Sequence, residues 1–153
     1  FLLGLLSPFV LWAELGYVGY EKVMSAFQRN DYGPDVVFFD EAKAQHFKKG
    51  QWKYPVPDFV VEVLSEGTEH RDRGVKFQDY EAQGVQEYWI IDAEEETVEQ
   101  YILKNGKFHL HLKASQGPIE SRVVKGFLID IRAIFDKDAH LAALREVMRG
   151  GQE

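Results

Sequence analysis

The chain has 153 residues, contains no cysteine and carries a formal net charge of −7. Its length fits one domain of ordinary size, and the lack of cysteine excludes disulfides, zinc–thiolate centres and thiol nucleophiles. The acidic balance argues against broad binding to nucleic acids, which usually requires a basic surface. It does not exclude a nuclease, because an acidic metal site adds negative charge that the bound cation offsets.

Residues 1–15 are apolar around most of a helical circumference and predict a helix. The apolar run is too short for a membrane span and lacks the basic region of a signal peptide. We therefore expect a cytoplasmic protein with no membrane partner, and a further amino-terminal segment before this helix. Gly16 and Gly19 interrupt the pattern, and the alternation over residues 20–27 predicts a strand.

Pro34 precedes a short apolar segment, residues 35–39, that predicts a second strand. Residues 40–57 are polar and contain Gly50 and two prolines, so they predict a long connection. Long connections within a compact domain are often functional.

Two buried strands and a helix follow. Residues 59–64 and 88–92 are apolar runs typical of buried strands. Between them, residues 75–83 form a short amphipathic pattern that Gly84 is suited to end. Because a helix joins the two strands, we expect them to be parallel.

The last third predicts an antiparallel extension and a closing helix. Residues 97–103 and 107–113 flank the turn sequence Asn105-Gly106, a strong hairpin signal. Residues 126–131 form an apolar return segment, and residues 137–149 predict a helix. The fold class is therefore α/β, with a mixed sheet and an added antiparallel hairpin.

Glu62 is the most unusual residue of the chain, because it lies inside an otherwise apolar strand pattern. The two-residue period of a strand puts Val60, Glu62 and Leu64 on one face and Val61 on the other. A charge in such a strand is costly unless it is paired or binds a metal.

Asp35 begins another predicted strand and is a candidate partner for Glu62. Two carboxylates brought together repel each other, so a divalent cation is a natural counter-charge, and hard oxygen ligands favour Mg²⁺ or Mn²⁺. Such a metal can polarise a phosphodiester. Lys76, on the following helix, could stabilise the charge that develops during cleavage.

Simpler interpretations of each residue stay open. Asp35 could cap the turn that ends at Pro34, Glu62 could form a structural salt bridge with Lys76, and Lys76 could be a solvated helix lysine. Asp72 and Asp79 are interpreted as surface or helix-start charges, and Asp58 as a strand-start residue that contacts the adjacent loop.

The chain resembles the Uma2 family, also called DUF820, of restriction endonuclease-like proteins. The resemblance covers nearly the whole chain, and its central block is specific. The matching parts are residues 34–38, 57–65, Asp72, Lys76, Tyr80, residues 84–85, 87–89, Asp92 and, more weakly, 126–135.

The resemblance implies a PD-(D/E)XK nuclease fold and a single restriction endonuclease-like domain over residues 1–153. Asp35 then resembles the motif aspartate and Glu62 the acidic residue of (D/E)XK. Leu64 stands where that motif has lysine, so Lys76 is the expected replacement. The metal ligands implied are Asp35, Glu62 and the backbone carbonyl of Val63.

The leading hypothesis is a Mg²⁺- or Mn²⁺-dependent endonuclease that acts on DNA, with Asp35, Glu62 and Lys76 as catalytic residues. Enzymes of this kind often pair to cut both strands, so we expect a homodimer. Two alternatives remain: a nuclease-fold binding or assembly module without catalysis, and a metal-dependent hydrolase of a small phosphate ester.

Overall fold

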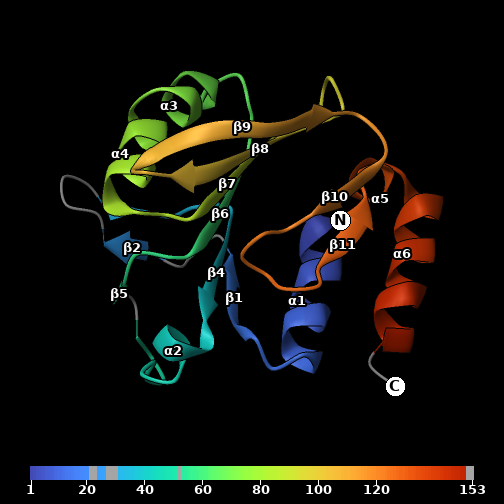
Figure 1. Ribbon diagram of the computed structural model, residues 1–153, viewed down its shortest axis with the longest axis horizontal. Helices are drawn as coiled ribbons and strands as arrows, with labels where there is room; N and C mark the ends of the chain where they lie inside the picture. The colour runs from blue at the N-terminus through green and yellow to red at the C-terminus, as the bar shows by residue number, and fades with distance from the viewer. Residues whose placement is uncertain (21–23, 27–30, 52, 151–153) are drawn as a thin grey trace.

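The computed structural model of the protein describes residues 1–20, 24–26, 31–51 and 53–150. Its centre is a mixed six-stranded sheet in the order β1-β4-β6-β7-β8-β9 (Figure 1). Only β6 and β7 are parallel neighbours in this sheet. The strands are β1 (Gly16–Tyr20), β4 (Val36–Asp40), β6 (Phe59–Val63), β7 (Glu87–Asp92), β8 (Thr97–Lys104) and β9 (Lys107–Ala114).

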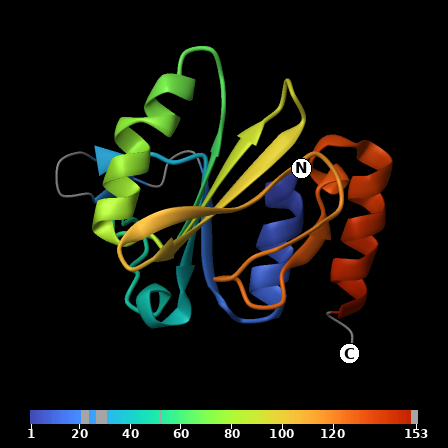
Figure 2. The ribbon, with the colours of Figure 1, turned by 45° about the horizontal axis from the view of Figure 1, so that its top comes forward.

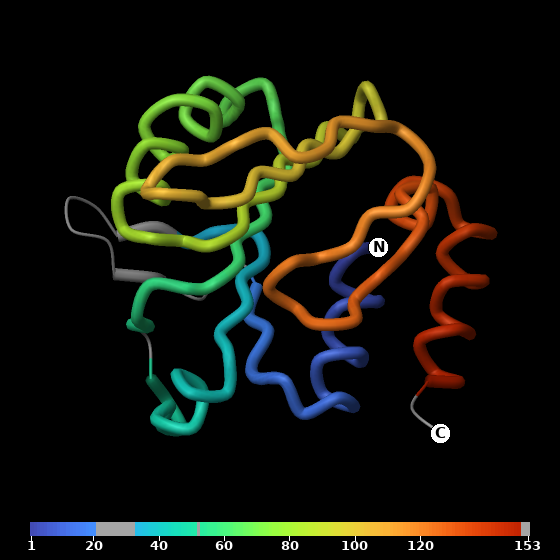
Figure 3. The backbone as a smooth tube through the Cα atoms, in the orientation of Figure 1, coloured from blue at the N-terminus to red at the C-terminus, as the bar shows by residue number. Residues whose placement is uncertain are grey.

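Helices cover both faces of the sheet. α3 (Glu69–Arg73) and α4 (Val75–Gln83) lie on one face, and α1 (Leu2–Trp12) lies on the other (Figure 2). α6 (Lys137–Gly150) runs beside α1, and the start of the chain lies close to both (Figure 3). The remaining helices are the short α2 (Glu41–Ala44) and α5 (Arg132–Phe135).

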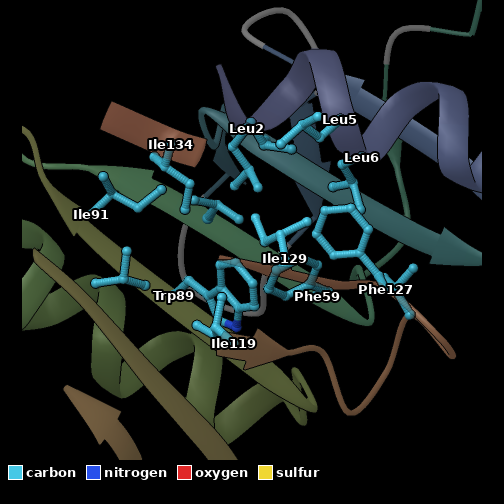
Figure 4. Close-up of a cluster of buried hydrophobic side chains, with 14 of the residues drawn as sticks. Leu2, Leu5, Leu6, Phe59, Trp89, Ile91, Ile119, Phe127, Ile129 and Ile134 are labelled. Carbon is cyan, nitrogen blue, oxygen red and sulfur yellow. The ribbon is translucent and has the colours of Figure 1, made fainter. Parts of the chain in front are cut away.

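The strand alternation divides the buried side chains between two cores. Phe59 and Val61 point into the larger core, where they pack with α1 residues such as Leu5 and with Trp89 (Figure 4). Val60 points into the smaller core under α4. The alternation predicted for this strand is therefore confirmed, and it turns Glu62 toward α4.

The central elements follow the sequence prediction closely. β6 and β7 are parallel and are joined through α3 and α4. Gly84 ends α4 in the left-handed conformation, with φ 85°. The hairpin of β8 and β9 turns at Asn105 and Gly106, which both have positive φ, as a two-residue turn of type I′ requires.

Three sequence predictions need correction. Gly16 and Gly19 do not interrupt the structure but lie within β1, which pairs with β4. At Gly16 a Cβ would overlap the Phe39 carbonyl, so the close pairing itself requires glycine. The expected connection over residues 40–57 contains α2 and β5 (Lys53–Tyr54). Of the strand expected over residues 20–27, β2 (Met24–Ala26) is present, and residues 21–23 and 27 lie outside the described residues.

Two small sheets complete the fold. β2 pairs with β3 (Asp31–Tyr32) and with β5. β10 (Pro118–Glu120) pairs with β11 (Leu128–Asp130), which lies in the expected return segment. None of the described helices has the length and hydropathy needed to cross a membrane.

A buried carboxylate fastens the loop after β10 to the main sheet. Glu87 of β7 is completely buried. It accepts hydrogen bonds from the Ser121 hydroxyl and from the backbone N–H groups of Arg122 and Val123, at 2.8–3.0 Å. The side chains of Trp89 and Gln100 donate to its other oxygen. Five donors therefore satisfy this buried carboxylate, and none of the ion pairs among the described residues involves it.

Candidate functional site

Neighbouring strands bring Asp35 and Glu62 together. Val36 of β4 pairs with Val61 of β6, so the same register extended by one residue places Asp35 opposite Glu62. Opposed residues point to the same face of a sheet, with Cβ atoms about 5 Å apart. The Asp35 carboxylate also accepts a 2.7 Å hydrogen bond from the Val63 N–H, which ties it to the end of β6.

Glu62 is a buried carboxylate whose side chain faces α4. It is 3% exposed, and the Tyr80 hydroxyl donates a 2.7 Å hydrogen bond to its Oε1. Burial raises the pKa of Glu62 to about 7, although Lys76 and Tyr80 act to lower it. The nearby carboxylates of Asp72 and Asp35 raise it further. Near neutral pH, this carboxyl is therefore poised between its protonated and ionised forms.

Lys76 lies between two acidic side chains. Its Nζ is 3.4 Å from Glu62 Oε1 and 3.0 Å from Asp72 Oδ1. The side chain is 12% exposed, so the interpretation as a solvated helix lysine is wrong. The ion pair with Glu62 that was left open as an alternative is present.

Asp72 is the member of this cluster that the sequence interpretation placed wrongly. It is completely buried, not a surface charge, and Asp79 is also buried. Within the described residues, Asp72 Oδ2 has no hydrogen-bond partner. The i,i+4 spacing to Lys76 was a signal for the pairing, but only the packing of α3 shows that the pair is buried.

Two tyrosines surround the acidic cluster and stay protonated. Burial raises the pKa of Tyr80 and of Tyr88 far above the ordinary value, and the charge of Glu62 raises both further. Tyr80 therefore acts as a hydrogen-bond donor to Glu62, not as a base. The Tyr88 hydroxyl donates a 2.9 Å bond to the backbone carbonyl of Asp72 and so fixes the end of α3.

An ion pair holds the end of α3 from the other side. Arg73 binds both oxygens of Glu99 on β8, at 3.0 and 2.7 Å. Burial acts to raise the pKa of Glu99, but hydrogen bonds from Arg73 and Tyr101 outweigh it and leave the pKa lowered. At the adjacent Gly74, a Cβ would lie 2.7 Å from the His70 carbonyl oxygen. Glycine is therefore needed where α3 meets α4.

The model of the Uma2 family, described as "Putative restriction endonuclease", matches residues 1–132. The chain belongs to the Uma2 family. No curated protein matches the chain.

The Uma2 assignment agrees with a solved structure. The fold is similar to that of "a putative nuclease belonging to DUF820" from Anabaena variabilis ATCC 29413, with a TM-score of 0.72. The two are 16% identical, and the match covers 94% of this chain and 77% of the other. At this identity the likeness concerns the fold, and it confirms the expected restriction endonuclease-like architecture.

The donor types of this Uma2 site suit Mg²⁺ or Mn²⁺, since Asp35, Glu62 and Asp72 supply carboxylate oxygens and no described residue donates a hydrogen bond to Asp72 Oδ2. Within residues 1–20, 24–26, 31–51 and 53–150, however, three or more acidic or histidine side chains are nowhere grouped as a preformed metal site. The metal ligands Asp35, Glu62 and the carbonyl of Val63 therefore stay a prediction.

Asp58 and Asp35 differ in what they bind. Asp58 accepts hydrogen bonds from the Lys43 ammonium and the Asp40 N–H, both at 2.8 Å, so it fastens α2 as a strand-start residue. Asp35, by contrast, bonds to Val63 at the end of the strand that carries Glu62. Of these two aspartates, Asp35 is therefore the one that lies beside Glu62.

Proposed function

We propose that this Uma2 protein is a Mg²⁺-dependent endonuclease that hydrolyses phosphodiester bonds of DNA, and that Mn²⁺ can replace Mg²⁺. The observation that carries the proposal is the hydrogen bond from the Val63 N–H to the Asp35 carboxylate, next to Glu62, with Lys76 at Glu62. Buried ionisable groups with shifted pKa values gather at functional sites, which supports a catalytic role for this cluster.

Asp35, Glu62 and the carbonyl of Val63 would hold the ion. When bound, the ion supplies a Lewis acid that polarises the phosphodiester and lowers the pKa of water. Glu62 has one oxygen fixed by the Tyr80 hydroxyl, which holds the carboxylate on the face of the sheet that α4 covers. The Asp35 carboxylate is oriented in the same way by the Val63 N–H.

Lys76 supplies the positive charge at this site. Its ammonium would stabilise the negative charge that builds on the phosphoryl oxygens in the transition state. Asp72 would hold that ammonium beside Glu62, since Nζ lies 3.0 Å from Asp72 Oδ1 and 3.4 Å from Glu62 Oε1. Asp72 is therefore a positioning residue that acts through Lys76.

A nicking assay tests the proposal. Purified protein with Mg²⁺ or Mn²⁺ is expected to nick supercoiled DNA, and Glu62→Gln is expected to abolish nicking. Glu95→Gln, which removes the charge of an exposed turn residue, is the matched control and should keep full activity. Equal nicking by wild type and Glu62→Gln would overturn the assignment of the site.

One observation favours a second candidate, a binding or assembly module without catalysis. Lys76 already compensates the charge of both Glu62 and Asp72 in the described structure. A folded protein that neither binds Mn²⁺ nor nicks DNA would support this candidate over the endonuclease.

We also infer a homodimer. Leu11 and Trp12, at the end of α1, are 79% and 46% exposed, and Trp12 lines a cavity of about 520 Å³ that α6 helps to form. Burial of this apolar surface against a second copy would stabilise a pair able to cut both strands. Sedimentation should show a dimer for the wild type and a monomer for Leu11→Glu; a monomeric wild type would contradict the inference.

A further inference from the structure

A second cavity, of about 480 Å³, lies at the other end of β4 from the acidic cluster. Tyr17 of β1, Phe47 and Tyr54 of β5 contribute to its walls, and Lys48 and Lys49 to its rim. α2 and β5 lie at this end of the sheet, whereas α3 lies at the opposite end (Figure 1).

The walls of this cavity are aromatic. The rings of Tyr17 and Tyr54 are nearly parallel, with centroids 6.0 Å apart and an interplanar angle of 7°. Phe47 packs edge-on against both, at 5.6 and 5.0 Å, and the cluster rests on the fully buried Phe39. Tyr17 is nevertheless 39% exposed, so part of its ring remains available for stacking.

The rim of the cavity is basic although the chain is acidic. Lys48 and Lys49 are exposed, and no ion pair involves either ammonium within the described part of the chain. Glu41 is the single acidic side chain among the lining residues, so the cavity carries a net charge of +1. Local charge of this sign favours an anionic ligand.

We propose that this cavity binds one unpaired nucleotide of a single-stranded nucleic acid. Aromatic faces stack on a base of any sequence, and neighbouring lysines bind the backbone phosphate, which is the combination used by single-strand binding proteins. A cavity of this volume also falls within the usual range for small-ligand sites.

The cavity and the acidic cluster lie on the same face of the sheet. Tyr17 is paired with Phe39, and Phe39 shares a strand face with Asp35 because the two are four residues apart. Four residues of an extended strand span about 14 Å. One single strand could therefore occupy both places, but binding at the cavity requires no catalysis at Glu62.

Charge reversal on the rim tests the proposal without the nuclease reaction. The affinity of a dye-labelled oligothymidylate is measured by fluorescence anisotropy, at low salt and with EDTA. Lys48→Glu/Lys49→Glu should weaken binding about tenfold or more, which corresponds to about 1.4 kcal/mol. The control Lys125→Glu/Lys137→Glu makes the same charge change at exposed lysines outside the cavity and should have little effect.

Two further binding measurements complete the test. The first separates the contribution of ring stacking from that of charge, and the second separates binding of a strand from binding of a free nucleotide. Tyr17→Phe should keep the affinity and Tyr17→Ala should lose about tenfold, because only the ring is needed for stacking. Thymidine monophosphate should bind more weakly than the oligonucleotide. Absence of oligonucleotide binding, equal effects of both lysine double variants, or tighter binding of the mononucleotide would overturn the proposal. Loss of nicking by Glu62→Gln alone would leave it intact.

Discussion

Glu62 shows most clearly how one residue can oppose folding and serve a site. Its pKa rises from 4.5 to about 7 on folding, chiefly because it is buried. The folded state therefore binds the proton more tightly, and the resulting stability is lost as pH rises through about 7. A residue with this cost is expected where function needs it.

We expect Glu62→Gln to be more stable than the wild type at alkaline pH. The shift from 4.5 to about 7 corresponds to at most about 3 kcal/mol of unfolding free energy. The difference should grow between these two pH values and stay level above them. Thermal unfolding in EDTA across this range measures it, with Glu95→Gln as the control. A Glu62→Gln variant that unfolds earlier than wild type at every pH would contradict the prediction.

Lys76 should be far more important for stability than an ordinary helix lysine. Lys76→Met leaves Glu62 and Asp72 buried without their cation, a change that typically costs about 3–5 kcal/mol. Adding Glu62→Gln should recover part of this loss without recovering activity. Denaturant unfolding measures both effects, and Lys125→Met provides an exposed control. A cost below about 1 kcal/mol would mean that the ion pairs are not stabilising.

At the scale of elements, the break between α3 and α4 determines where Asp72 and Lys76 lie. Arg73 fastens α3 to β8, the Tyr88 hydroxyl binds the last turn of α3, and Gly74 permits the close approach of the His70 carbonyl. Asp72 and Lys76 lie on either side of Gly74, and contacts from β7 and β8 thus fix both.

Gly74→Ala is expected to disturb the site as well as the fold. A Cβ at this position would lie 2.7 Å from the backbone carbonyl oxygen of His70, which cannot shift without disturbing α3. We therefore expect the free energy of unfolding to fall by about 2 kcal/mol or more. Gly67→Ala has open space and is the matched control. Circular dichroism would report stability, and nicking would report the site. Equal behaviour of the two variants would show that α3 and α4 can separate without cost.

The Glu87 contacts should matter to the β10–β11 region even though they are far from any proposed chemistry. Glu87→Gln replaces one acceptor oxygen with an NH₂ group, which then faces groups that also donate. Because five donors surround this side chain, we expect the free energy of unfolding to fall by roughly 3 kcal/mol. The exposed neighbour Glu120→Gln should cost almost nothing. Chemical denaturation compares them, and similar midpoints would show that the loop does not depend on this carboxylate.

The elements predicted well from sequence are those with strong local patterns. β6, α4 and the β8–β9 hairpin follow from an apolar run, an amphipathic segment and an Asn-Gly turn. β1 was missed because its first residue, Gly16, is required by close pairing with β4, which is a tertiary requirement. The burial of Asp72 was missed for the same reason, since a short polar helix such as α3 does not reveal from its sequence which face is covered.

For the molecule as a whole, the acidic balance and a nucleic-acid substrate are compatible because charge is unevenly placed. Buried carboxylates gather at one end of β4, and a small basic cavity with aromatic walls lies at the other. The net charge of −7 therefore limits nonspecific binding without excluding a directed one.

Asp35 and Glu62 are proposed to share one divalent cation. Titration of the protein with Mn²⁺, followed by the electron paramagnetic resonance signal of free Mn²⁺, tests it most directly. We predict one ion per chain, lost in Asp35→Asn and in Glu62→Gln but kept in Glu95→Gln, with affinity that rises with pH through about 7 as Glu62 gives up its proton. Binding that is unchanged in both site variants, or no binding by the folded wild type, would contradict the account.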